Sequence, residues 1–182
     1  MKVIGIKRLF YFDPLTAKVE KAEMLAKLKA AKEIKNTHGD TFTYEQGDPD
    51  VEEGKNGLTG KTYYRIKKNE GAKTISFTSG EFDLEDKVAL QGGKANDGIW
   101  EAPTTLDFIN KGIAAYTQTN DLVVFTNASI IGKTSKQDSV LGLGVQATAM
   151  DSGVKDVSDE YWYEGAKLPE NLTKWLKGES EE

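Results

Sequence analysis

Hydrophobic and polar residues alternate along several short stretches of this chain, and that pattern predicts β-strands. Residues 3–12 alternate, residues 113–117 and 122–126 are β-branched and aromatic runs joined by a polar turn, and residues 141–149 alternate again. The two middle runs predict a hairpin. In the last run, leucine, valine and alanine share one face while glycine, glutamine and threonine share the other. We therefore expect the first of those faces to be buried.

More extended segments are expected in the first half of the chain. Residues 41–44 begin a second strand, and residues 61–67 and 74–78 predict two strands that form a second hairpin. Residues 46–60 are rich in glycine, proline and acidic side chains, which predicts a long exposed loop. Such a loop is either an interaction arm or a solvated surface insertion, and the sequence leaves both readings open.

Three segments have the composition of helices. Residues 16–35 consist mainly of strong helix formers, and Thr16 is a candidate N-cap. A short helix is predicted from Asp83 up to the glycine pair that begins at Gly92. Residues 169–178 open on proline and form an amphipathic pattern, which predicts a C-terminal helix.

The predicted fold is mainly β with flanking helices (α+β), either an antiparallel β-sandwich or a small barrel. Residues 1–178 form one domain, with a helical insertion at about 16–35 and an extended loop at about 46–60. Residues 179–182 are expected to be a disordered acidic tail.

Composition removes several classes of function. The formal net charge is −5 and the isoelectric point is near 5.1, which argues against tight nucleic-acid binding by charge neutralisation. The chain has no cysteine and a single histidine, so disulfides, thiolate sites and multi-histidine metal centres are excluded. Neither a signal peptide nor a membrane span is expected, and the chain is predicted to be made in a cytosol.

Candidate catalytic patterns each lack a required part. Residues 54–62 resemble a phosphate-binding loop but have one residue too many and follow an acidic segment. Asp48, Asp50 and Glu52 alternate as in a calcium loop, but the turn glycine is missing. His38 has no serine or cysteine nucleophile motif to serve. We expect no enzyme activity, no cofactor and no metal.

Apolar side chains exceed what one buried face requires. The first strand and the strand from residue 122 carry them on both faces, so either a continuation of the sheet or a packed neighbour is expected to cover the surplus. Trp100 and the aromatic run 161–163 could stack on sugars or bases, although core or subunit contact is favoured. The candidate subunit-contact residues are Phe10, Phe12, Val123, Phe125 and Trp175.

The order of these elements resembles one protein family. Residues 74–78, the short helix with its glycine pair, the segment Asn127-Ala-Ser-Ile-Ile-Gly132, a polar loop and the alternating strand 141–150 resemble the major tail tube proteins of long-tailed bacteriophages. The resemblance covers roughly residues 61–150. It implies a β-sandwich or small barrel flanked by a helix, with subunits in hexameric rings that stack into a hollow tube for DNA passage.

The resemblance also implies partners and a location. The partners would be further copies of the chain, other tail proteins and transiently passing DNA, in a virion tail made in the host bacterial cytoplasm. The loop 46–60 would then be an arm between stacked rings, through Asp48, Asp50, Glu52, Glu53 and Leu58. Two alternatives remain: the inner-tube protein of a contractile secretion system, and a carbohydrate-binding β-sandwich.

Overall fold

The fold is built almost entirely from antiparallel strands. The computed structural model describes residues 5–38, 40–105, 107–137 and 140–168. Within these ranges the elements are β1 (Ile6–Phe12), α1 (Lys21–Leu28), β2 (Lys32–Thr37), β3 (Thr43–Gln46), β4 (Asp50–Lys55), β5 (Thr62–Asn69), β6 (Lys73–Glu81), α2 (Leu84–Gln91), β7 (Lys94–Asn96), β8 (Ile99–Glu101), β9 (Ile109–Thr117), β10 (Leu122–Gln137), β11 (Val140–Ala149) and β12 (Glu160–Tyr163).

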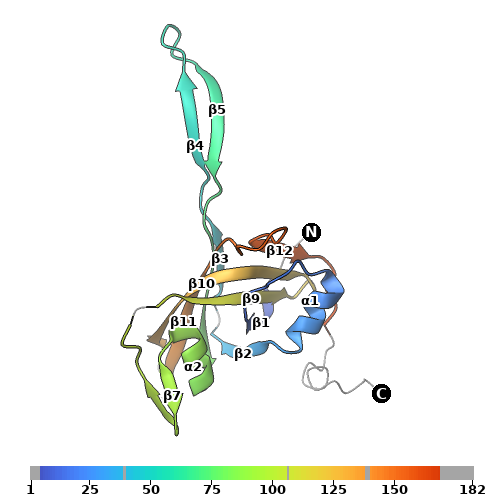
Figure 1. The fold of residues 1–182 in the computed structure, drawn as a ribbon, viewed down its shortest axis with the longest axis vertical. Helices are drawn as coiled ribbons and strands as arrows, with labels where there is room; N and C mark the ends of the chain where they lie inside the picture. Colours follow the sequence, from blue (N-terminus) through green and yellow to red (C-terminus); the bar gives the residue numbers. More distant parts are fainter. Residues whose placement is uncertain (1–4, 39, 106, 138–139, 169–182) are drawn as a thin grey trace.

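One sheet closes on itself to form the body of the molecule (Figure 1). Its strands follow the order β11-β10-β9-β1-β2-β6, and β11 also pairs with β6, which closes these six strands into a barrel. Two short strands extend the wall: β3 pairs with β6 beyond the end of β2, and β12 pairs with β10 beyond the end of β11. β6 therefore has three partners, and its register is set by all of them.

The barrel encloses the first of two hydrophobic cores. Side chains from β1, β6, β9, β10 and β11 meet there, and Leu90 of α2 packs into the same cluster. Large apolar residues such as Phe77, Ile113 and Phe125 are almost fully buried in it. Aliphatic and aromatic side chains of this size each contribute about 1.5–3 kcal/mol when they leave water, so the barrel is stabilised from inside.

A second core lies on the outer face of β1, β9 and β10. α1 and the segment before it cover that face, with Met24 and Leu28 packed against Phe10, Tyr116 and Val124. The same three strands thus contribute alternate side chains to the barrel interior and to the layer under α1. This second layer accounts for the apolar residues on both faces of these strands within a single chain.

The predicted helix over residues 16–35 is wrong at both ends. α1 spans only Lys21–Leu28, and its N-cap is Glu20 rather than Thr16, with the Glu20 N–H donating to the Glu23 carboxylate at 3.1 Å. Residues from Lys32 onward form β2 instead. They pair with β1 and bury Ile34 in the barrel, and this tertiary pairing overrides their helix propensity.

The predicted short helix is confirmed as α2. The Asp83 carboxylate accepts a hydrogen bond from the backbone N–H of Asp86 at 2.8 Å, and the helix ends at Gly92, whose φ is +86°. Each signal acts within one turn of its own end of the helix, so both can be recognised from the local sequence.

Two of the predicted strand connections differ from the structure. The hairpin of β9 and β10 is confirmed, with Leu122 opposite Tyr116. The second hairpin is wrong, because β5 pairs with β4 and β6 pairs with strands of the barrel. The predicted polar loop after Gly132 is also strand, since β10 runs to Gln137 and pairs with β11 along that length.

The predicted C-terminal helix and acidic tail lie outside the described residues. In the described ranges, neither α1 nor α2 has the length and apolar character needed to cross a membrane.

Candidate functional site: a projecting hairpin arm

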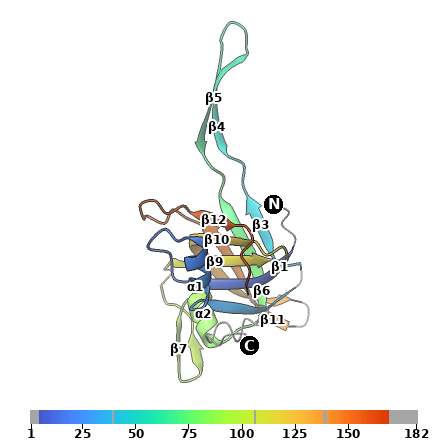
Figure 2. The same cartoon turned by 90° about the vertical axis from the view of Figure 1, so that its right-hand side faces the viewer.

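A long β-hairpin stands clear of the barrel and is the most distinctive surface feature of the molecule (Figures 1 and 2). We call residues 48–70 the arm. It grows out of the β3–β6 pair: the strands separate at Gly47 and Gly71, then pair again as β4 and β5. At this neck the Gly47 N–H donates to the Ala72 carbonyl at 2.9 Å. A Cβ on Gly71 would lie 1.7 Å from the Gly47 carbonyl oxygen, so the two chains approach too closely for a side chain there.

The arm ends in a turn organised by Asn56. Its side-chain oxygen accepts hydrogen bonds from the N–H groups of Leu58 at 2.8 Å and Thr59 at 3.2 Å. The backbone N–H of Gly60, at φ +67°, donates to the Asn56 carbonyl at 2.8 Å. Asparagine is suited to this place because its side chain can satisfy backbone groups within a turn. Leu58 lies within this turn, at the tip of the arm.

Cross-strand contacts hold the two strands of the arm together. Lys68 pairs with Glu52 at 2.8 Å and Arg65 pairs with Glu53 at 2.9 Å. The Tyr64 ring lies over Gly54, where a Cβ would come within 1.9 Å of the ring, and its hydroxyl donates to Glu52 at 3.1 Å. The hydrogen bond from Lys68, and then that from Tyr64, hold the pKa of Glu52 below its usual value. Exposed ion pairs stabilise weakly, so the arm depends chiefly on its backbone ladder.

The arm buries none of its large apolar side chains in either core. Leu58 is 98% exposed, Tyr63 69% and Ile66 56%. A two-stranded ribbon without a packed face is marginally stable in water. Its length and its exposed apolar side chains therefore make the arm the candidate interaction segment of the molecule.

A polar cluster anchors the root of the arm to β12. Lys73 pairs with Asp159 at 3.0 Å and with Glu160 at 3.2 Å, and Glu160 also accepts hydrogen bonds from the Tyr44 hydroxyl at 2.8 Å and from Trp162 Nε1 at 2.6 Å. Burial alone would lower the pKa of Lys73, but the hydrogen bonds to Asp159 and Glu160 outweigh it and raise that pKa. Burial, together with the hydrogen bond to Glu160, raises the pKa of Tyr44.

The structure brings all five candidate inter-ring residues into the arm, but not as a loop. Asp50, Glu52 and Glu53 lie on β4, while Asp48 lies in the neck and Leu58 at the tip. Sequence reasoning missed the other half, because it assigned β5 to a hairpin with β6. One signal was present: residues 62–69 carry polar or charged side chains on both faces and gather no continuous apolar face, as expected of a strand that packs on no core.

The candidate subunit-contact residues lie elsewhere. Phe10 and Phe125 are 0% exposed and Val123 is 4% exposed, so all three are buried in the chain's own cores. Phe12 is partly buried against the core under α1, and Trp175 is outside the described residues. We expected a neighbour to cover the surplus apolar residues of these strands. In the structure α1 covers them within the chain.

Both tryptophans of the candidate aromatic platform make contacts within the chain. The Trp100 Nε1 donates to the Gly92 carbonyl at 2.9 Å, and Lys87 Nζ sits 3.8 Å from the centre of a Trp100 ring, which covers that face. Trp162 meets Tyr44 edge-on at 5.9 Å, at the root of the arm. Trp100 is therefore engaged in contacts within the chain, whereas Trp162 remains 44% exposed beside its contact with Tyr44.

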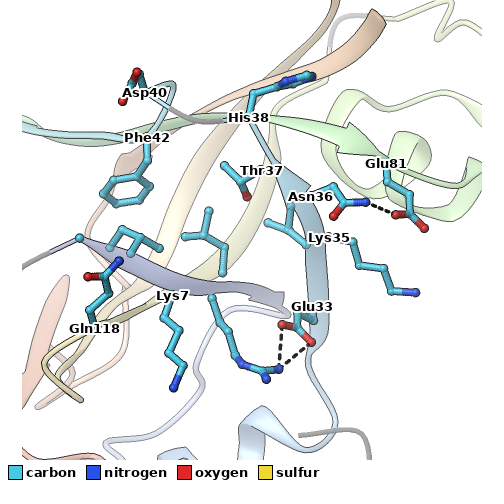
Figure 3. Close-up of a pocket in the computed structure, with 15 residues that line it drawn as sticks. Lys7, Glu33, Lys35, Asn36, Thr37, His38, Asp40, Phe42, Glu81 and Gln118 are labelled. Carbon is cyan, nitrogen blue, oxygen red and sulfur yellow. Dashed lines mark hydrogen bonds and ion pairs between the residues drawn. The ribbon is translucent and has the colours of Figure 1, made fainter. Parts of the chain in front are cut away.

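A second candidate site is a groove of about 870 Å³ where β1 and β2 diverge (Figure 3). Its lining mixes both signs of charge and includes the Arg8–Glu33 ion pair at 3.1 Å. The His38 ring packs against Gly80 and Gly142, and its Nε2 atom has no hydrogen-bond partner among the residues described. A general base must reach the proton that it removes. Among the residues that the structure describes, no hydrogen-bond partner is in place to exchange a proton with this ring nitrogen.

The other sequence motifs also fall on the arm. Residues 54–62, which resemble a phosphate-binding loop, form the tip of a hairpin rather than a strand-to-helix turn. Of the alternating carboxylates in the calcium-like pattern, Asp50 and Glu52 lie on β4 and Asp48 lies in the neck before it. Across the described part of the chain, no three histidine or acidic residues gather as ligands for a metal ion.

No protein-family model matches the sequence, and no curated protein is significantly similar to it.

Proposed function

We propose that this chain is a structural subunit that assembles into rings, hexameric in the tail tube family it resembles, and that the rings stack into a hollow tail tube for DNA passage. One observation carries the proposal: a closed barrel presents a long arm whose apolar residues have no place in their own chain. The body supplies a rigid repeating unit, and the arm supplies reach beyond it. No catalytic role is proposed for any residue.

The net negative charge of the molecule is compatible with a channel through which DNA passes. A formal net charge of −5 gives DNA little to bind, whereas a protein that holds DNA normally presents a basic patch. A channel wall that repels phosphate weakly lets the polymer pass. The fold and charge suit a secretion-system tube equally well, so that assignment is the nearest alternative to a virion tail.

The test is to remove the arm and observe assembly. Replacing residues 48–71 by Asn-Gly would join Gly47 to Ala72 through a tight two-residue hairpin turn. We expect a folded barrel that no longer forms tubes, while the unmodified chain forms rings and tubes with a central hole. Light scattering across protein and salt concentration, with negative-stain images of the same samples, distinguishes these states.

Folding of the arm-less chain serves as the control. Because the arm contributes to neither core, the melting temperature of the arm-less chain should stay within a few degrees of that of the full chain. Tubes of normal length from the arm-less chain would contradict the role of the arm. An unmodified chain that stays monomeric in every condition, and binds soluble glycans until Trp162→Ala is introduced, would favour the carbohydrate-binding alternative.

A further inference from the structure

An apolar groove lies at the base of the β7–β8 hairpin. It has a volume of about 510 Å³ and runs between the end of α2, the chain before β9 and the middle of β10. Phe108 is 87% exposed on its wall and Ile131 is 59% exposed. Single exposed apolar residues are common on protein surfaces, but two that line one groove form a patch suited to an apolar partner.

This groove and the arm tip are at opposite ends of the molecule. Both views show the arm at one end of the body and the β7–β8 hairpin at the other (Figures 1 and 2). The arm therefore cannot fill the groove of its own chain. A contact between two different ends of identical subunits is heterologous, and such contacts repeat without closing when subunits stack in one direction.

The two surfaces also match in chemistry. Leu58 at the tip is flanked by Lys55 and Lys61, all three exposed. The groove carries Glu101 and Asp107 against one cation, Lys94, so its ionised side chains are net negative. An apolar side chain within a positive rim thus meets an apolar wall within a negative rim, and charge complementarity of this kind fixes partner and orientation.

We propose that Leu58 at the arm tip of one copy inserts into the Phe108–Ile131 groove of the copy stacked above or below it. The inference rests on the proposed function, because it names where the arm docks when tubes form. Lys55 and Lys61 pair with Glu101 and Asp107 around the inserted leucine.

Cross-linking tests the contact directly, since the chain has no native cysteine. A chain with both Leu58→Cys and Phe108→Cys should, under tube-forming conditions, oxidise to a ladder of dimers, trimers and longer disulfide-linked species. A disulfide needs Cα atoms within about 7 Å, so a ladder reports true proximity. The matched control pairs Leu58→Cys with Lys155→Cys, an exposed position away from the groove, and should give no ladder.

Charge reversal tests the rim independently. Lys55→Glu with Lys61→Glu should raise the protein concentration needed for tubes by about tenfold or more. Adding Glu101→Lys and Asp107→Lys to the same chain should restore assembly toward that of the unmodified protein. Circular dichroism and melting curves on each variant show whether the barrel is intact.

The outcomes separate this docking from the proposed function. A ladder together with charge rescue supports both. Tubes that form normally, but without a Leu58→Cys to Phe108→Cys ladder, overturn the docking and leave the tube function standing. An unmodified chain that forms neither rings nor tubes overturns the proposed function, and the docking with it.

Discussion

Asp83 combines two roles in one side chain at the start of α2. Its carboxylate caps the helix through the Asp86 N–H and pairs with Lys32 Nζ at 2.8 Å. We expect Asp83→Ala to lower the free energy of unfolding by about 1 kcal/mol, the usual cost of losing a cap. Asp83→Asn should cost less, because asparagine still caps the helix. Chemical denaturation of the three proteins measures the difference.

The pH dependence of that comparison separates charge from capping. The hydrogen bond from Lys32 holds the pKa of Asp83 below its usual value of 3.8. A lowered folded pKa means that the contribution of the charged form is complete above the unfolded pKa and is lost as pH falls through the folded one. The advantage of the native protein over Asp83→Asn should therefore be constant above about pH 5 and shrink below about pH 4. An advantage independent of pH would contradict the ion-pair role.

Gly71 is required by close approach at the neck. A methyl group there would overlap the Gly47 carbonyl oxygen, whereas a Cβ on Gly57 at the tip would meet nothing within 4 Å. Gly71→Ala should lower the free energy of unfolding by about 1–3 kcal/mol, as overpacking does, because the strained backbone continues into β6. Gly57→Ala is the matched control and should leave stability unchanged. Equal melting temperatures for the two variants would exclude this reason for the glycine.

At the scale of elements, the polar cluster that joins β6, β3 and β12 holds the root of the arm. Lys73→Ala would leave the nearly buried Glu160 without its cation. We expect a loss of about 2–3 kcal/mol in the free energy of unfolding, since an uncompensated charge in a partly buried site is costly. Glu160→Gln in the same chain should recover part of that loss. A double-mutant cycle measures the coupling, and simple additivity would show that the two side chains act independently.

The attachment of α1 is a second element-scale prediction. Leu28 is fully buried beneath the helix, and Lys27 beside it is exposed. Leu28→Ala should cost about 2–5 kcal/mol through lost transfer energy and the cavity that remains. Lys27→Ala should change the free energy of unfolding by under about 0.5 kcal/mol. Denaturant titration of the two variants compares a core position with a surface position on the same helix.

Elements defined by local signals were predictable, and those defined by distant pairing were not. α2 carries its cap, its dipole charges and its glycine stop within residues 83–92, so the sequence alone predicts it. Lys32–Thr37 has good helix formers, but its conformation is decided by pairing with β1 and β6, far away in sequence. Only the first half of the arm was predicted. The composition of residues 46–60 indicated an exposed segment, but the partner of β4 is fixed by its pairing with β5, which composition does not reveal. The groove is assembled from separate segments, and no local pattern marks it.

At the scale of the whole molecule, two regions of very different stability share one chain. The barrel has two packed cores, whereas the arm has a backbone ladder and exposed ion pairs. Backbone amides of β4 and β5 should therefore exchange with solvent at least about a hundredfold faster than those of β9 and β10 in the free subunit. In assembled tubes the arm amides should become protected. Hydrogen exchange measured on both forms checks this, and arm amides that exchange equally fast in tubes would contradict a docked arm.

The three partners of β6 determine the order in which parts of the molecule can fold during synthesis. A chain leaves the ribosome N-terminus first, so the arm emerges well before β11, the strand that must meet β6 to close the barrel. Ile131, on one wall of the groove, also belongs to this late part of the chain. A nascent chain therefore exposes its own arm residues before it has the groove that could bind the arm of another copy. On the proposed docking geometry, a tube can therefore grow only from completely synthesised subunits, because an incomplete chain lacks the closed barrel and the groove that binds the arm.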